Sequence, residues 1–254
     1  MGYGGIPGYG PPQPAPPGWG APPYGSPPPP PGGPPTAGAA WSPTEAIQVA
    51  LQRLRADPGG ILLPLGIALM IESLPTLSTN VGARIGLFPA PASLLDPQAL
   101  VPAAVANVVG IVVRSFLEGG VNRFCLNVVR GRPYALGDVF GEVRLFLPYL
   151  ALNLIVSIAV GVGMLLLLVP GVILALGWSL AEPLLVDRTL GPIDALRESW
   201  RLTDGHKGAL FVFALLVVGV VLLGACACGV GVFVAVPVVW LARAWIYTRL
   251  SGTG

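Results

Sequence analysis

Charged residues are scarce in this 254-residue sequence, and some types that carry chemistry are almost missing. Asp, Glu, Lys and Arg make up 10% of the chain, against about 25% in an ordinary soluble domain. His206 is the single His, and Lys207 is the single Lys. One His excludes a His-rich metal cluster and the paired His of a zinc-protease helix. The formal charge of +2 is small and the basic residues are dispersed, so nucleic acid is not an expected partner.

Cysteines and catalytic motifs are equally sparse. The three Cys are Cys125, Cys226 and Cys228, and the single residue between the last two does not match the spacing of a redox or zinc motif. We interpret Cys226 and Cys228 as small residues that allow close helix contact near a membrane turn. No Gly-rich stretch continues into Lys-Ser or Lys-Thr, which excludes a phosphate loop. A Ser-His dyad with His206 is left as a formal alternative, but no nucleophile-elbow sequence accompanies it. We therefore expect no enzyme activity, catalytic residue, cofactor or metal.

Apolar residues are abundant, at 54% of the chain, and they are concentrated in four long runs. The runs cover Gly59–Leu77, Leu100–Val113, Leu145–Val186 and Gly208–Leu241. One helical span needs roughly 20 apolar residues, so the last two runs are each long enough for two spans. The sequence thus predicts an all-α membrane protein with about six transmembrane helices, and the lipid bilayer as its main partner.

The first part of the chain has a different composition. Residues 1–41 are dominated by Pro and Gly, with Tyr3, Tyr9, Trp19 and Tyr24 interspersed. Such a segment buries too little apolar surface to offset its ordering entropy, which predicts a disordered tail. It is either a solvated tether or a docking segment for a protein partner or another copy of itself. Residues 42–250 then form the predicted membrane domain, and its first span is expected to act as an uncleaved insertion signal.

A short amphipathic helix is predicted just before the first span. Ser42 is placed to cap it, Pro43 suits the first helical position, and Glu45 would complete a capping box. Ile47, Leu51 and Leu54 share one face, while Arg53 and other polar residues lie on the remaining faces. This pattern favours a helix that lies at the membrane surface.

The same arrangement recurs along the chain. Pro192–Leu196 parallels Pro43–Ile47, and the apolar run that follows begins at the same offset from each Pro. A looser copy begins at Pro133–Leu136, with Val139, Phe140 and Val143 continuing its stripe. We therefore expect three units, each an interfacial helix followed by two spans. Internal repeats of this kind occur in many membrane folds, including transporters.

The distribution of basic residues predicts the orientation. With the N-terminus inside, Arg84 alone would lie outside, Arg114 would lie within a span, and twelve basic residues would lie on the cytoplasmic side. These twelve are Arg53, Arg55, Arg123, Arg130, Arg132, Arg144, Arg188, Arg197, Arg201, Lys207, Arg243 and Arg249. The prediction is a multi-pass protein of the cytoplasmic membrane with both termini in the cytoplasm.

Four ionisable residues fall at membrane depth. They are Glu72, Arg114, Glu118 and Glu182. Arg114 and Glu118 stand one helical turn apart and can pair, with Asn122 on the same stripe. Depth argues against a direct triad of Glu72, Arg114 and Glu182. The four residues are either an ion, proton or lipid-headgroup site between helices, or structural pairs and snorkelling side chains.

Prolines and glycines within the apolar runs predict kinks, turns and close helix contacts. Kinks are expected at Pro64, Pro148, Pro183 and Pro237. A tight turn between the third and fourth spans is expected at Val169-Pro170-Gly171. Close helix approach is expected at several glycines, namely Gly161, Gly163, Gly219, Gly224, Gly229 and Gly231.

Two sequence stretches carry a family resemblance. Val169–Arg188 is followed by Gly-Pro-Ile-Asp-Ala-Leu-Arg-Glu-Ser-Trp-Arg-Leu-Thr203, and a middle segment contains Arg130-Gly-Arg-Pro133 with Leu136-Gly-Asp-Val-Phe140. Over roughly residues 42–250 the chain resembles an uncharacterised bacterial integral membrane family that includes the membrane domain of some glycerophosphodiester phosphodiesterases. The resemblance implies six spans with surface helices. It transfers no catalytic residue, because this sequence has no room for a phosphodiesterase domain.

Two functions remain open at this point. The first is a non-enzymatic scaffold or envelope-organising membrane protein, favoured by the missing catalytic residues and the tail. The alternative is a small-solute or lipid transporter with a site at the interface between the repeats. The sequence does not indicate an oligomeric state.

Overall fold

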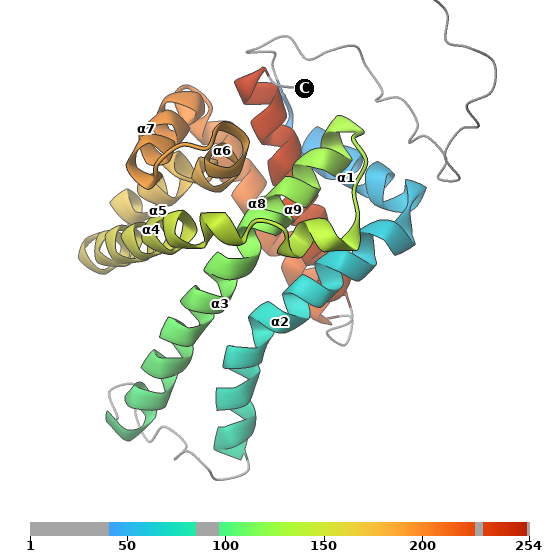
Figure 1. The fold of residues 1–254 in the computed structure, drawn as a ribbon. Coiled ribbons are helices and arrows are strands. Elements are labelled where there is room, and N and C mark those ends of the chain that lie inside the picture. The colour runs from blue at the N-terminus through green and yellow to red at the C-terminus, as the bar shows by residue number, and fades with distance from the viewer. Residues whose placement is uncertain (1–40, 85–96, 227–230, 253–254) are drawn as a thin grey trace, which may run out of the picture.

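The computed structural model describes residues 41–84, 97–226 and 231–252 (Figure 1). These residues are helical and include no strand. The predicted tail lies outside them except for Trp41, and so do Cys228 and Gly229. In chain order the elements are α1 (Pro43–Ala56), α2 (Pro58–Arg84), α3 (Pro97–Arg130), the 3₁₀ helices η1 (Leu136–Phe140) and η2 (Val143–Leu145), α4 (Phe146–Leu166), α5 (Leu168–Gly177), α6 (Ala181–Arg188), α7 (Pro192–Thr203), α8 (Lys207–Cys226) and α9 (Val232–Ser251).

Six segments of the described chain are long and apolar enough to cross a membrane, as the hydrophobic runs predict. They are Pro58–Pro75, Ala104–Arg130, Leu136–Leu166, Val169–Arg188, Lys207–Cys226 and Val232–Ser251. The predicted all-α membrane fold is therefore confirmed. The second span also continues as a partly polar helix to Arg130, as expected.

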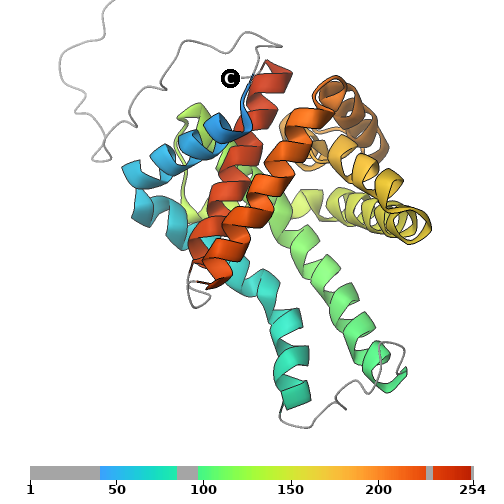
Figure 2. The same cartoon turned by 180° about the vertical axis from the view of Figure 1, so that it is seen from behind.

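The three-unit arrangement is present as three helical hairpins, α2/α3, α4/α5–α6 and α8/α9, each preceded by a short surface element. Those elements are α1, the η1–η2 segment and α7. The far halves of α2 and α3 extend well away from α4 and α5, whereas α9 lies among α1, α2, α3 and α8 (Figures 1 and 2). The hairpins thus converge at one end and diverge at the other.

Burial is uneven among the helices. The candidate span of α9 is 56% buried inside the molecule, whereas the spans containing α4 and α8 are each 11% buried. Leu241, Ile246 and Tyr247 of α9 are fully buried and form much of the core with Phe124 of α3. The apolar surfaces of α4 and α8 suit contact with lipid tails, which need no polar partner.

The middle unit departs from the predicted pattern in its leading element. Instead of one amphipathic α-helix it begins with two 3₁₀ turns, and of the predicted stripe only Val139 is buried, while Phe140 and Val143 are exposed. This segment crosses α3 at two glycines. A Cβ on Gly120 would lie 1.8 Å from the Val139 carbonyl oxygen, and one on Gly119 would lie 3.2 Å from Cβ of Glu142. The crossing is possible because these positions have no side chain.

The fourth span is broken, and the break lies before the predicted kink at Pro183. The helix α5 ends at Gly177, and α6 starts at Ala181. Pro183 lies in the first turn of α6, where a missing N–H costs no intrahelical hydrogen bond. The break leaves backbone groups without a partner inside the helix, and Ser199 of α7 bonds to two of them. Its Oγ donates to the Gly177 carbonyl at 2.8 Å and accepts from the Leu180 N–H at 3.2 Å.

The N-terminus of α1 differs from the predicted capping box. Ser42 occupies the N-cap position, but its hydroxyl pairs with Thr44 Oγ1 at 2.8 Å and makes no capping bond. Glu45 contacts Arg249 at 3.6 Å instead of closing the box. Arg53 is not on an exposed face, because it is buried and donates to the Val129 carbonyl at 3.4 Å. The acceptor is a backbone carbonyl in the last turn of α3, which has no partner within its helix. The sequence around Arg53 does not predict this contact, because the two residues are 76 positions apart.

The predicted turn between the third and fourth spans and the predicted kink at Pro148 are wrong, whereas two other prolines lie inside helices as expected. The turn between α4 and α5 is at Leu167 rather than at Val169-Pro170-Gly171, since Pro170 lies in the first turn of α5. Pro148 likewise lies in the first turn of α4 and produces no interior kink. Pro64 and Pro237 do lie inside helices.

Close helix contacts occur within two of the hairpins. A Cβ on Gly163 would lie 3.0 Å from Cα of Gly171, and one on Gly231 would lie 2.6 Å from Cα of Gly224. Close approach is therefore confirmed at Gly163, Gly224 and Gly231. It is wrong for Gly161 and Gly219, where a Cβ would meet nothing within 4 Å.

Candidate functional site

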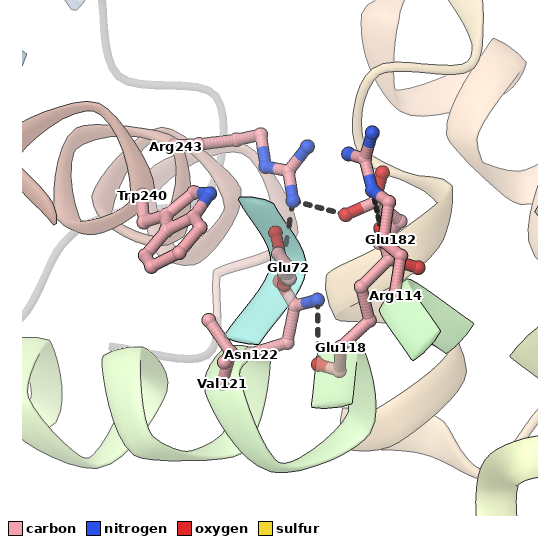
Figure 3. Close-up of a pocket in the computed structure, with 8 residues that line it drawn as sticks. All are labelled: Glu72, Arg114, Glu118, Val121, Asn122, Glu182, Trp240 and Arg243. Carbon is pink, nitrogen blue, oxygen red and sulfur yellow. Dashed lines mark hydrogen bonds and ion pairs between the residues drawn. The ribbon is translucent and has the colours of Figure 1, made fainter. Parts of the chain in front are cut away.

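A small polar pocket lies where the three units converge, at membrane depth (Figure 3). Its free space is about that of one water molecule. All four ionisable residues that the sequence singled out line it, together with residues from α3 and α9. The lining residues are Glu72, Arg114, Glu118, Val121, Asn122, Glu182, Trp240 and Arg243.

The predicted pair between Arg114 and Glu118 is present on α3. Arg114 Nε donates to Glu118 Oε1 at 2.5 Å. The second carboxylate oxygen of Glu118 accepts from Asn153 Nδ2 of α4 at 2.7 Å, and Asn153 also donates to Ser115 Oγ at 2.9 Å. The Glu118 side chain is 5% exposed and the Arg114 side chain is 53% exposed. Glu118 is therefore held between two helices, while Arg114 lies at the open side of the cluster.

Glu182 is paired with a residue that the sequence analysis assigned to the cytoplasmic end. Arg243 of α9 forms an ion pair and hydrogen bond with the Glu182 carboxylate of α6. Arg243 also lies 3.5 Å from Asn122 Oδ1, and the Tyr149 hydroxyl donates to the Glu182 carbonyl at 2.7 Å. The last apolar run ends at Leu241, so the sequence pattern predicts Arg243 on the cytoplasmic side. Continuing the helical pattern through residue 251 would have placed Arg243 inside the sixth span.

Glu72 of α2 lines the same pocket without a direct partner. Among the described residues its carboxylate has no hydrogen bond and no ion pair, although Figure 3 shows it beside Asn122 and below Arg243. No direct triad with Arg114 and Glu182 forms, as predicted. Glu72, Arg114 and Glu182 nevertheless line one pocket, so they lie closer in depth than their positions in the apolar runs indicate. The break before α6 brings Glu182 to this level.

A second layer of polar contacts joins α3, α6 and α9 at the end of α3 that carries Arg130. Arg130 of α3 donates to both carboxylate oxygens of Asp187 of α6, at 2.5 and 2.8 Å. The Tyr247 hydroxyl of α9 donates to Asp187 Oδ2 at 2.7 Å. The Arg130 side chain is 7% exposed, so this residue, predicted from the sequence only to lie on the cytoplasmic side, is buried in an ion pair at the end of α3. The short helix α6 therefore carries one carboxylate in each layer, Glu182 and Asp187.

Polar contacts outside the spans fix the surface elements. The Tyr134 hydroxyl donates to Asp57 Oδ2 at 2.9 Å, and burial with this hydrogen bond raises the pKa of Tyr134 to about 12. Glu198 of α7 accepts from Arg201 at 2.7 Å and from Arg188 at 2.9 Å. The hydrogen bond from Arg201 is the main reason that the pKa of Glu198 is lowered. These contacts link the junction of α1 and α2 to the η segment, and α6 to α7.

His206 precedes α8, and Lys207 is the first residue of that helix. His206 is half-buried, with its ring 6.5 Å from that of Trp41. Lys207 Nζ lies 4.1 Å from the centre of the Trp200 ring and 3.4 Å from Asp204. These contacts are structural and contain no nucleophile.

Metal ligands and reactive thiols do not gather in the described part of the chain. No group of three or more His, Cys, Asp or Glu is arranged there to hold a metal ion. Cys125 is buried in the core, and Cys226 is exposed at the end of α8. The arrangement in the pocket is thus one of carboxylates, guanidinium groups and amides, which can bind a polar or ionic group by hydrogen bonds and charge.

Comparison with known proteins places this architecture among membrane proteins. The chain is 29% identical over 137 residues to "Uncharacterized protein Rv2560" of Mycobacterium tuberculosis, covering 54% of this chain and 42% of that protein. It is 31% identical over 124 residues to "UPF0259 membrane protein SG1383" of Sodalis glossinidius, covering 47% of this chain and 50% of that protein. The matches therefore span about half the length of these relatives or less. No solved structure matches the chain. A model of the uncharacterised protein family UPF0259 matches residues 93–235, more than half of the sequence, so the chain belongs to that family.

Proposed function

We propose that this protein is a non-enzymatic membrane transporter that handles a small polar solute or a lipid headgroup at the pocket between its three units. The proposal rests on the observation that the charged residues of the pocket come from all three units. Glu72 and Arg114 come from the first unit, Glu182 from the second and Arg243 from the third. A site assembled from all three hairpins senses any movement of one hairpin against another.

The energetics of the pocket support a functional role. An ionisable side chain at the centre of a bilayer costs about 2.5–3.5 kcal/mol on insertion scales. The pairs Arg114–Glu118 and Arg243–Glu182 offset part of that cost, but Glu72 has no such partner among the described residues. A purely structural cluster needs no third carboxylate. Glu72 is therefore the group that argues for a bound ligand.

Transport is tested with the full chain reconstituted into liposomes. Flux of polar solutes and exchange of headgroup-labelled lipids between leaflets are measured for wild type, Arg114→Leu and Glu182→Gln. We expect both variants to lose most of the flux. Arg197→Gln, on the exposed face of α7 with its side chain 79% exposed, is the matched control and should retain it. Flux that is indifferent to both pocket substitutions would remove the proposed site.

We also propose that the protein is inserted in the cytoplasmic membrane with both termini in the cytoplasm. Support comes from α1, the η segment, α7 and the C-terminal end of α9, which all lie in the same half of the molecule (Figure 1). These elements carry six of the fourteen basic residues, namely Arg53, Arg55, Arg144, Arg197, Arg201 and Arg249. Basic residues favour the cytoplasmic side. Reporter fusions at residues 1, 90 and 205 test the orientation. An external signal at residue 1 would contradict it.

A scaffold that organises partners or envelope lipids is the second candidate. It is favoured by the apolar surface near the turn of α4/α5, where Leu165, Leu167 and Val169 are 86%, 68% and 67% exposed. Partner helices could pack on this surface as readily as lipid tails. The proline-rich residues 1–41 would then be a docking segment. Deleting residues 1–41 tests that part, because an unchanged set of co-purified proteins would exclude tail docking.

The relation to the membrane domain of some glycerophosphodiester phosphodiesterases is likewise a proposal. It is supported by the motifs within Val169–Arg188 and Gly191–Thr203. In this structure those motifs form α5, α6 and α7, which carry Glu182 and the hydrogen bonds that support the break before α6. The shared feature would be a membrane role, with no catalytic residue transferred. A hybrid that replaces this region with the corresponding domain and keeps flux would support the relation.

A further inference from the structure

We infer that the pocket recognises a zwitterionic headgroup that contains a phosphate ester and a primary ammonium, with the phosphate on Arg114 and the ammonium on Glu72. The inference rests on the proposed function and specifies its ligand class. It starts from two groups of opposite charge that line one pocket and leave hydrogen-bonding capacity unused.

Arg114 supplies the unused donors. Its Nε is bonded to Glu118, but its two terminal nitrogens make no hydrogen bond among the described residues, and Figure 3 shows no dashed line at them. The residue lies ten positions from Ala104, or about 15 Å along the helix, in a span that continues to Arg130. Donors left unsatisfied at that depth are costly. The half-exposed guanidinium therefore needs an acceptor from outside the described chain.

A phosphate ester is the acceptor that fits best. A guanidinium presents a planar fork of N–H groups, which matches two phosphate oxygens in parallel. The face of α3 that leads to Arg114 is open, because a Cβ on Gly110 would meet nothing within 4 Å and Asn107 is exposed. In this region α3 also extends away from α4 and α5 (Figures 1 and 2). A headgroup can reach Arg114 from the lipid along that face.

Glu72 supplies the unused acceptor, and its negative charge is the reason that we infer an ammonium group in the ligand. The pocket has room for about one water-sized group, and a primary ammonium is of that size and carries three donors. The two Arg and three Glu of the pocket sum to a formal charge of −1. A zwitterion leaves that sum unchanged, whereas a headgroup with one negative charge would lower it to −2 and increase the repulsion. The site therefore favours a headgroup with both charges over one with phosphate alone.

The test is native mass spectrometry of the full chain, purified in detergent and titrated with defined lipids. We expect phosphatidylethanolamine to bind about tenfold more tightly than phosphatidylglycerol, which lacks the ammonium, or phosphatidylcholine, whose quaternary ammonium is larger and donates no N–H. Equal affinity for the three lipids would overturn the inference. Displacement of the lipid by free phosphoethanolamine would support the same chemistry with a soluble ligand. Lack of displacement would support the lipid as its source.

Variants separate the two halves of the headgroup. Glu72→Gln should abolish the preference for phosphatidylethanolamine over phosphatidylglycerol. The double variant Arg114→Gln/Glu118→Gln removes both members of that ion pair together, and it should weaken binding of both lipids about tenfold. Arg144→Gln, whose side chain is 86% exposed on the η segment, is the control and should change nothing. If Glu72→Gln keeps wild-type selectivity and the double variant keeps wild-type affinity, while both elute as folded monodisperse protein, the assignment is wrong.

The outcomes for binding and transport are distinguishable. Selective binding in the absence of any flux would remove the transporter proposal and leave a structural headgroup site. Flux that depends on Arg114, without selectivity for an amine-bearing headgroup, would retain the transporter and remove the ligand class inferred for it.

Discussion

Glu182 and Arg243 lie 61 residues apart in the sequence and form a partly buried ion pair between α6 and α9. The pair joins the second unit to the third at membrane depth, beside the Arg114–Glu118 pair of the first unit. Because α6 is a short helix of 8 residues, separated from α5 and α7 by non-helical residues, its side-chain contacts determine where it lies. The pocket therefore depends on contacts between units rather than on any single helix.

Breaking this ion pair on one side should destabilise the protein. Glu182→Gln leaves the partly buried Arg243 guanidinium without its counter-charge. The loss is about 3–5 kcal/mol for a fully buried pair, and we expect less for this one. Thermal unfolding of the detergent-solubilised protein measures the effect. The double variant Glu182→Gln/Arg243→Gln is the control and should recover part of the loss. Additive effects of the two substitutions would show that the side chains are not coupled.

Asp187→Asn should release α6 from α3 and α9 at the second polar layer. Its carboxylate accepts two hydrogen bonds from the buried Arg130 and one from Tyr247, and breaking such a pair costs about 3–5 kcal/mol. Tyr247→Phe removes one hydrogen bond to a charged group and should cost about 1.5–3 kcal/mol. The measurement is the midpoint of unfolding for both variants under identical conditions. A larger effect of Tyr247→Phe would contradict the primary role of Arg130.

Gly120→Ala should displace the η segment from α3. The new Cβ would overlap the Val139 carbonyl oxygen, and backbone shifts of this kind cost about 1–3 kcal/mol or more. Gly110→Ala is the matched control in the same helix, because its Cβ would meet nothing within 4 Å. That control should be neutral or should stabilise by about 0.5–1 kcal/mol. Equal stability of the two variants would mean that the segment does not cross α3 so closely.

Alkaline pH should weaken the contact between Tyr134 and Asp57. The pKa of Tyr134 is raised from its ordinary value of 10 to about 12 in the folded protein, by burial and by its hydrogen bond to Asp57. A raised folded-state pKa contributes stability that is fully present below pH 10 and is lost as the pH rises towards about 12. Unfolding midpoints of wild type and Tyr134→Phe should therefore converge over that interval. A constant difference between the two proteins would exclude titration of Tyr134 as the cause.

The pocket was only partly predictable from the sequence. Glu72, Arg114, Glu118 and Glu182 stand out because an ionisable residue in an apolar run is expensive and therefore conspicuous. The Arg114–Glu118 pair follows from helical periodicity, since residues four apart share a face. Arg243 was missed because it lies just past the end of an apolar run, where a basic residue normally marks the cytoplasmic boundary. Its role follows from the position of Glu182, which depends on the break before α6.

The length and composition of the apolar runs were enough to establish six helical spans, because the thickness of a bilayer sets the length of a span and every backbone polar group must be satisfied within it. The repeated Pro-led segments likewise indicated three units. Tertiary structure decided which charges meet. Ser199 and Gly177 support the break that repositions Glu182, Gly119 and Gly120 let the η segment cross α3, and Arg53 and Arg130 find acceptors on distant elements. These contacts join residues far apart in the sequence, and no local pattern of hydrophobicity or spacing encodes them.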